Sequence, residues 1–161
     1  TTADAPLVGG TYEDYDGFMA EASASRPDNV PEETLNHFLK HYGDAYTQLI
    51  ALIAEEPGLV EPLGPTSPVT GAEIVYAAQS EMAVTLADAV FGRTTLGFFG
   101  WPGDAVLRRA AELMARSTGW DDAQQNEQIE SVRAVYAMRG VAYDARPVPA
   151  EPTPTSHEVP A

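Results

Sequence analysis

Apolar residues recur at helical spacing along most of this chain, in runs separated by residues that start or stop helices. Tyr15, Phe18 and Met19 share one face, so the first run predicts a short helix. It should stop at Pro27, because the residue before a proline is pushed out of the α region. Pro31, followed by two glutamates, predicts a second helix, since proline is tolerated at a helix start and acids there complement the helix dipole.

The next segment predicts a helical hairpin. The second helix should run to about Tyr42, where Gly43 can take the left-handed conformation that ends a helix. Asp44 is then expected to cap a third helix. The apolar stripe of that third helix comprises Tyr46, Leu49, Ile50 and Ile53.

The middle of the chain contains a long proline-rich and glycine-rich loop. Between Pro57 and Gly71, four prolines and three glycines exclude a helix. The apolar residues expected to pin this loop to the core are Leu59, Val60 and Leu63. The helical pattern then returns, and a capping signal at Thr85 predicts either one bent helix over 72–91 or two helices broken near Val84.

The last third of the chain predicts two more helices. The first opens after Pro102 and ends at Gly119, and Asp121 forms a capping box with Gln124 at the start of the second. The last helix is expected to bury Ile129, Val132 and Tyr136. The aromatic residues of the preceding loop that we expect to turn inward are Phe98, Phe99 and Trp101.

These patterns predict an all-α fold, a compact bundle of about six helices with irregular loops rich in proline and glycine. No Asn-Gly hairpin, sustained period-two alternation or internal repeat indicates a sheet. Residues 1–145 are expected to form one helical domain, in which residues 1–10 are a loop that begins as though entered from something upstream. Residues 146–161 are expected to be a disordered tail, because their Pro/Glu/Thr composition has nothing to bury.

Charge and cysteine content narrow the functional classes. The chain has 24 acidic against 9 basic residues, a net charge of −15, and Lys40 is its only lysine. This charge repels phosphate and anionic lipid, so we expect neither nucleic acid nor direct membrane-surface binding. The absence of cysteine excludes disulfides, thiolate nucleophiles and iron–sulfur clusters. An acidic, lysine-poor surface also suggests adaptation to high salt.

No motif for self-contained catalysis is found. The chain has no G-x-G-x-x-G turn and no phosphate-binding P-loop, so we expect no catalytic and no cofactor-binding residue in it. His37 and His41 are one helical turn apart and could share a metal, but the sequence supplies no third ligand, and Phe38 stands where a catalytic zinc helix has glutamate. We therefore expect no metal site. Without a leader or a run of roughly 20 apolar residues, the chain is expected to be soluble and cytoplasmic.

One segment carries a family resemblance. From residue 73 to residue 94 the sequence reads EIVYAAQSEMAVTLADAVFGRT. A Glu-x-x-Tyr helix, a second glutamate, a Thr-Leu-x-Asp turn and an Arg-Thr ending in this order resemble the C-terminal domain of FAD-dependent, aerobic-type glycerol-3-phosphate dehydrogenases. The helix end at Gly43 and the Gly-Trp before the last helix agree with it. Gly92 departs from the pattern, because the family usually has the first of two arginines there.

The resemblance implies a role beside a larger domain. The family oxidises sn-glycerol 3-phosphate to dihydroxyacetone phosphate and passes electrons through FAD to a quinone or to oxygen. FAD and the substrate bases belong to the N-terminal FAD-binding domain, so this domain is expected to pack on and support that partner without catalysis of its own. The resemblance also allows a homo-oligomer and a parent enzyme peripheral to the inner face of a membrane.

Three charged residues within this segment are the candidates for a structural ion pair or a domain interface: Glu81, Asp88 and Arg93. Charges set in an otherwise apolar helix surface persist only when they are paired. We therefore expect Arg93 to bridge to Glu81 or to Asp88 and so to fasten the bend near Val84.

Two other functions remain open at this point. A stand-alone helical module could bind a basic partner through its acidic face. A small metal-dependent hydrolase could use His37 and His41. A nucleotide-binding unit upstream of Thr1 would favour the dehydrogenase domain over both.

Overall fold

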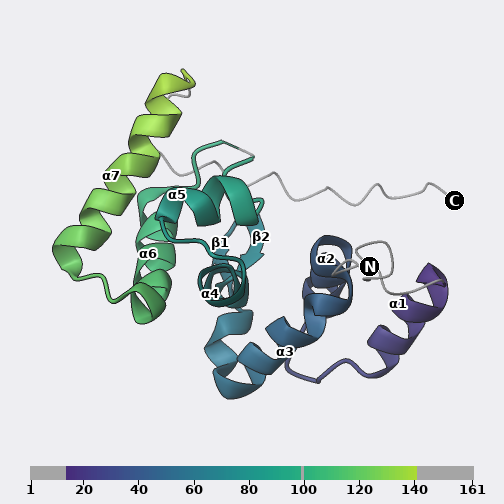
Figure 1. Cartoon of the computed structure of the whole chain (residues 1–161). Helices are drawn as coiled ribbons and strands as arrows, with labels where there is room; N and C mark the ends of the chain where they lie inside the picture. Colours follow the sequence, from purple (N-terminus) through teal and green to yellow (C-terminus); the bar gives the residue numbers. More distant parts are fainter. Residues whose placement is uncertain (1–13, 99, 141–161) are drawn as a thin grey trace, which may run out of the picture.

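The computed structural model describes residues 14–98 and 100–140, and within these ranges the chain is an all-α domain, as predicted (Figure 1). Six of the described helices span ten residues or more, in agreement with the expected bundle. The helices are α1 (Tyr15–Ala24), α2 (Glu32–Tyr42), α3 (Tyr46–Glu55), α4 (Gly71–Ser80), α5 (Leu86–Asp88), α6 (Asp104–Thr118) and α7 (Asp122–Met138). The predicted N-terminal loop and C-terminal tail lie outside the described residues.

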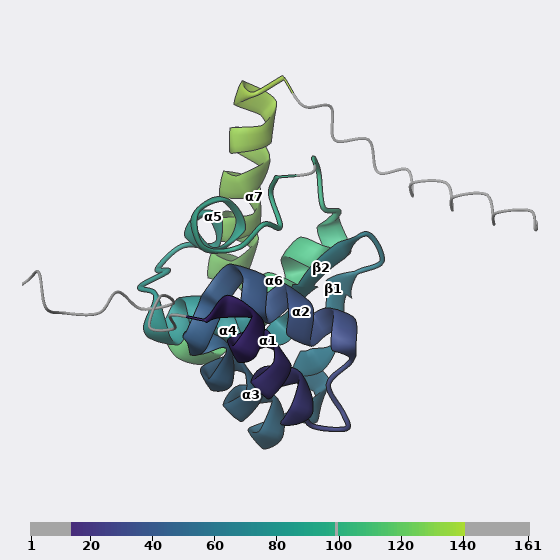
Figure 2. The same ribbon diagram turned by 90° about the vertical axis from the view of Figure 1, so that its right-hand side faces the viewer.

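Helix α4 occupies the centre of the bundle. It packs against α3 on one side and α6 on the other, and α7 lies against α6 at the edge opposite α1 (Figures 1 and 2). Every residue from Gly71 to Ala77 is buried, so the whole first half of α4 is surrounded by other elements. A side chain in this half can therefore contact several elements at once.

The junction of α2 and α3 differs from the prediction. Gly43 has a positive φ of 54°, as expected at a helix end, but a 3₁₀ turn, Gly43–Ala45, leads directly into α3. The N-cap of α3 is Ala45, with no side-chain capping hydrogen bond. The prediction that Asp44 caps this helix is wrong, because the amide of Tyr46 already donates to the carbonyl of Gly43.

The sequence predicted no sheet, and this prediction is also wrong. Strands β1 (Pro62–Gly64) and β2 (Ser67–Thr70) form an antiparallel hairpin, with Pro62 opposite Thr70. Strands of three and four residues are too short to show a period-two pattern, and their prolines argue against a strand in sequence. The apolar residues of the loop do pin it to the core, as predicted, since Leu59 is buried and Val60 and Leu63 pack against the core.

The segment after α4 follows the two-helix alternative. Helix α4 ends at Ser80, and α5 begins after the N-cap Thr85, so the break falls near Val84 as predicted. Helix α5 continues into a π-helical turn, Ala89–Arg93. In the connecting loop Met82 has a φ of +56°, which is uncommon for a residue other than glycine.

The two C-terminal helices confirm their predicted ends. Gly119 is left-handed at the end of α6, with a φ of 75°. At the start of α7 the side chain of Asp121 accepts from the amide of Gln124 at 2.8 Å, and the Gln124 side chain accepts from the amide of Asp121 at 2.9 Å. The core residues predicted for α7 are all buried: Ile129, Val132 and Tyr136.

The aromatic loop before α6 only partly follows the prediction. Trp101 packs against the core, but Phe98 is 68% exposed, so its inward orientation was predicted wrongly. Phe91 and Trp101 both pack on Tyr136 beneath this loop, and the Tyr136 hydroxyl donates to the carbonyl of Gly100 at 2.8 Å. Tyr136 thus binds the backbone on both sides of Phe98, at Gly97 and Gly100, so the loop is anchored without the Phe98 ring. Phe99 lies outside the described residues.

Candidate functional site around a buried glutamate

Glu73, in the first turn of α4, is the centre of the site. It is 1% exposed, and no other charged residue among the described ones is buried to this degree. Its Oε2 accepts hydrogen bonds from the amide of Thr70 at 2.7 Å and from the Thr70 hydroxyl at 3.2 Å. The glutamate therefore caps its own helix, which satisfies an amide that the helix leaves without a partner.

Two side chains of α2 complete the surroundings of this carboxylate. Nε2 of His37 lies 2.9 Å from Oε1 of Glu73, and the Tyr42 hydroxyl donates to the same oxygen at 3.1 Å. Burial raises the pKa of Tyr42, and the charge and hydrogen bond of Glu73 raise it further, so this hydroxyl stays a donor. Four hydrogen bonds thus hold one buried carboxylate between α2 and α4.

His41 extends this polar cluster toward the surface. Its ring lies 4.4 Å from the ring of His37, centroid to centroid. Burial lowers the pKa of His41 and the neighbouring His37 lowers it further, while the charge of Glu73 acts in the opposite direction. The described residues contain no group of three or more histidine, cysteine or carboxylate side chains arranged to hold a metal ion. Within the pair, His37 directs its Nε2 to Glu73.

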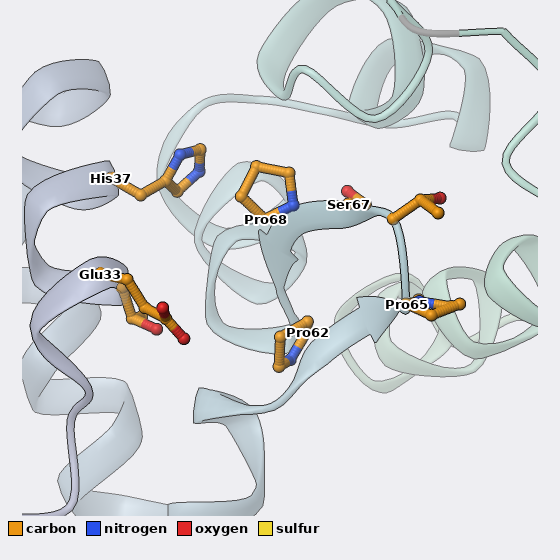
Figure 3. Close-up of a pocket in the computed structure, with 9 residues that line it drawn as sticks. Glu33, His37, Pro62, Pro65, Ser67 and Pro68 are labelled. Carbon is orange, nitrogen blue, oxygen red and sulfur yellow. The ribbon is translucent and has the colours of Figure 1, made fainter. Parts of the chain in front are cut away.

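A large cavity opens on the His37 side of the cluster. It has a volume of about 720 Å³ and lies between α2 and the β1–β2 hairpin (Figure 3). His37 and Glu33 project from α2 on one side, facing Pro68 and Pro62 on the other. The full lining is Glu33, Thr34, His37, Pro62, Gly64, Pro65, Thr66, Ser67 and Pro68. Three of its nine lining residues are prolines, and five carry side chains that can donate or accept hydrogen bonds.

A smaller cavity lies on the Tyr42 side and includes Glu73 itself. Its volume is about 190 Å³, and the residues around it come from α2, α4, the α4–α5 loop, the π-helical turn and the loop that follows. They are His41, Tyr42, Glu73, Glu81, Gly92, Arg93, Thr94, Thr95 and Phe98. We call it the Glu81 cavity. The Glu73 cluster therefore separates two hollows of different character.

The structure brings two of the three candidate residues together in the Glu81 cavity. Nε of Arg93 donates to the backbone carbonyl of Glu81 at 2.8 Å, and Nη1 donates to the carbonyl of Gly92 at 3.2 Å. Arg93 thus joins the end of the π-helical turn to the end of α4, near the predicted bend. Its contact with Glu81 is to the backbone, so an ion pair with the carboxylate of Glu81 or Asp88 stays a prediction.

The carboxylate of Glu81 is poorly satisfied. Its Oε2 is buried and has no hydrogen-bond partner among the described residues. Burial raises the pKa of Glu81 and the charge of Glu73 adds to this, whereas Arg93 lowers it. An acceptor buried without a donor costs free energy, which makes Glu81 unlike the fully bonded Glu73.

Asp88 lies outside the lining of the Glu81 cavity and caps helix α5. Its carboxylate accepts from the amides of Thr85 at 2.9 Å and Val84 at 3.1 Å, and its own amide donates to the Thr85 hydroxyl at 3.1 Å. Burial acts to raise the pKa of Asp88, but these hydrogen bonds and the charge of Arg93 outweigh burial and lower it. Asp88 is the capping-box acid of α5 and does not line the Glu81 cavity.

Sequence reasoning missed the central role of Glu73 and its partner Tyr42. One signal could have found the glutamate: Thr70 stands three positions before it and an apolar run follows, the pattern of a capping box. No local pattern links Tyr42 to Glu73, because 31 positions separate them in the chain. The meeting of Glu73 with α2 is a consequence of packing alone.

Comparison with known proteins gives one family. The family model described as the C-terminal domain of alpha-glycerophosphate oxidase matches residues 1–125. A glycerol-3-phosphate dehydrogenase from Synechocystis is 28% identical over 130 residues, covering 80% of this chain and 23% of the relative. The mitochondrial glycerol-3-phosphate dehydrogenase of Homo sapiens is 33% identical over 110 residues, covering 65% of this chain and 15% of the relative.

A plant relative shows the same partial coverage. The mitochondrial glycerol-3-phosphate dehydrogenase SDP6 of Arabidopsis thaliana is 29% identical over 98 residues, covering 58% of this chain and 16% of the relative. The chain thus spans less than a quarter of the length of these curated relatives. No solved structure gives a significant match.

Proposed function

The chain belongs to the family of the C-terminal domain of alpha-glycerophosphate oxidase, and we propose that it is the helical cap of a flavin-dependent glycerol-3-phosphate dehydrogenase. The parent enzyme would oxidise sn-glycerol 3-phosphate to dihydroxyacetone phosphate and pass the electrons through FAD to a quinone. The match of the family over residues 1–125 carries this proposal. The relatives described above, all of them glycerol-3-phosphate dehydrogenases by name, support it.

The described residues do not fit FAD. Dinucleotide binding of the usual kind needs a parallel β-α-β unit with a glycine-rich turn. The sheet in the described ranges is an antiparallel hairpin of two short strands. We therefore assign the cofactor and the substrate-binding residues to the N-terminal domain of the same polypeptide, and no catalytic step to this chain.

The role left for this chain is to pack on that domain and support it. The Glu73 cluster favours a rigid support, since two of its hydrogen bonds tie α2 to α4 and two more cap α4 through Thr70. None of the described helices is both long and apolar enough to cross a membrane. A cytoplasmic parent that is peripheral to the membrane, and self-association of the cap, are further parts of the proposal.

A second candidate rests on the net charge of −15. An acidic helical module that acts alone would use this charge to attract a basic partner. The sequence encoded upstream of Thr1 separates the two functions. A β-α-β unit with a G-x-G-x-x-G turn there is the result we expect, and an upstream region without a nucleotide-binding unit would overturn the dehydrogenase proposal.

A further inference from the structure

Exposed apolar side chains are found in the lining of the Glu81 cavity and in the loop that adjoins it. Among the described residues, five large apolar side chains are exposed, and three of them belong to the cavity or to its adjoining loop. Phe98, which is 68% exposed, lines the cavity itself. Met82, which is 81% exposed, follows Glu81 directly in the α4–α5 loop, and Val84, which is 69% exposed, is two positions further on. We call the surface formed by Glu81, Met82, Val84, Arg93 and Phe98 the Glu81 face.

Backbone contacts on both sides of Met82 fix the turn that carries it. The amide of Ala83 donates to the carbonyl of Ala77 at 3.0 Å, and the carbonyl of Glu81 accepts from Arg93 at 2.8 Å. Met82 lies between these two anchors with a φ of +56°. A left-handed conformation costs free energy for a residue with a side chain, so the surrounding bonds must maintain it. The exposed methionine is therefore presented by a fixed turn.

One carboxylate oxygen of this face lacks a hydrogen-bond donor. Oε2 of Glu81 is buried without a partner, and the nearby buried charge of Glu73 makes the cavity still more negative. Arg93 does not donate to that oxygen, because its guanidinium hydrogen bonds go to the backbone carbonyls of Glu81 and Gly92. A cationic side chain from outside would supply the missing hydrogen bond and be attracted by both carboxylates.

The size of the cavity favours a single side chain. Its volume is about 190 Å³, whereas pockets for drug-sized molecules hold roughly 300–1,000 Å³. A lysine or arginine that enters from a facing protein surface would bring apolar neighbours against Met82, Val84 and Phe98. These contacts would form an apolar rim that excludes water from the charged contact, as the neighbours of hot-spot residues do in protein interfaces.

We propose that the Glu81 face docks on the N-terminal flavin domain of the same polypeptide, and that a lysine or arginine of that domain enters the cavity and donates to Glu81. This inference rests on the proposed function. The relatives argue for this occupant, because the matched region is at most 23% of their length in the three compared above and is covalently joined to a far larger remainder. Such a partner is present at high effective concentration.

Hydrogen–deuterium exchange on the full-length polypeptide tests the proposal. We expect amides of residues 81–98 to exchange about tenfold more slowly in the full-length protein than in the 161-residue chain. Met82→Asp should abolish this protection, because it places a charge in the apolar rim. Aspartate tolerates a left-handed φ, so the fold of the isolated chain should be kept. Met138→Asp is the matched control, since Met138 is 80% exposed at the end of α7 and should leave the protection unchanged.

Glu81→Gln provides a second variant. It should not lower the melting temperature of the isolated chain, but it should speed exchange at residues 81–98 in the full-length protein. Equal exchange of residues 81–98 in the two proteins, in a full-length polypeptide that binds FAD and oxidises glycerol 3-phosphate, would overturn the docking proposal alone. Protection that grows with the concentration of the isolated chain would place a second copy on this face and also overturn it. A full-length polypeptide without a flavin domain would overturn the proposed function itself.

Discussion

Nε2 of His37 and Oε1 of Glu73 lie 2.9 Å apart, and their contact joins two helices across 36 positions of sequence. The same carboxylate caps α4 through Thr70 and accepts a hydrogen bond from Tyr42. One buried acid therefore fixes the start of the central helix and the position of α2 beside it. Removing this acid should have a larger effect than removing any exposed one.

Glu73→Ala should lower the free energy of unfolding by about 3 kcal/mol, because it leaves the buried donors of its partners without an acceptor. Urea unfolding followed by circular dichroism measures the change. Glu61→Ala, at an exposed position, is the control and should change the free energy by less than about 0.5 kcal/mol. Equal losses in the two variants would contradict the central position of Glu73.

Glu81 should make the domain less stable as the pH rises. Burial raises its folded-state pKa above the ordinary value of 4.5, so the folded state retains this proton where the unfolded state has lost it. Stability should then fall between the ordinary and the raised pKa. Glutamine cannot ionise, so Glu81→Gln does not lose this stability. The difference in stability between the variant and the native chain should therefore grow, in favour of the variant, from pH 4 to pH 7. Melting curves at both pH values, with Glu55→Gln as control, measure this, and an advantage confined to pH 4 would contradict it.

Two glycines should respond in opposite ways to alanine. A Cβ at Gly92 meets nothing within 4 Å, and this position lies in the π-helical turn. Gly92→Ala should therefore stabilise the chain by about 0.5 kcal/mol, since it restricts the unfolded state. Gly119 has a φ of +75°, so Gly119→Ala should destabilise by about 1 kcal/mol. Thermal unfolding compares the pair, and destabilisation by both variants would refute the described geometry of Gly92.

A double-mutant cycle tests the ion pair predicted for Arg93. Because its hydrogen bond goes to the backbone carbonyl of Glu81, Arg93→Ala should cost about 1 kcal/mol whether or not Glu81→Gln is present. The coupling free energy should then be below about 0.5 kcal/mol. A favourable coupling well above that value would instead show that the two side chains form an ion pair.

The acidic composition predicts a response to salt. With a net charge of −15, self-repulsion should destabilise the chain in dilute buffer and be screened by salt. The melting temperature should therefore rise from dilute to molar potassium chloride. A melting temperature that stays flat or falls across this series would exclude adaptation to high salt.

The confirmed predictions concern residues whose hydrogen bonds are made with neighbours in the sequence. Asp121 and Gln124 cap each other within three positions, and Thr85 and Asp88 do the same at the break near Val84. These capping hydrogen bonds are local, so they can be predicted without the tertiary structure. The all-α class and the ends of most helices were predictable for this reason.

The predictions that were wrong concern features set by tertiary packing rather than by a local sequence pattern. The β1–β2 hairpin consists of strands too short for a pattern, and Phe98 is exposed in a loop that is anchored through its backbone, at Gly97 and Gly100, to Tyr136. Within the site, sequence reasoning expected Arg93 to bridge to Glu81 or Asp88, and that ion pair stays a prediction. The hydrogen bond from Arg93 to the backbone carbonyl of Glu81 is a contact that no pattern of residue types could have indicated.

Reduction of bound flavin by substrate tests the central claim most directly. The full-length polypeptide that contains this chain is purified, and its flavin absorbance is followed in the absence of oxygen as sn-glycerol 3-phosphate is added. We predict a yellow protein whose flavin band bleaches, whereas the 161-residue chain mixed with FAD forms no yellow complex. A full-length polypeptide that binds no flavin, or whose flavin stays oxidised with this substrate, would contradict the assignment of the chain to a glycerol-3-phosphate dehydrogenase.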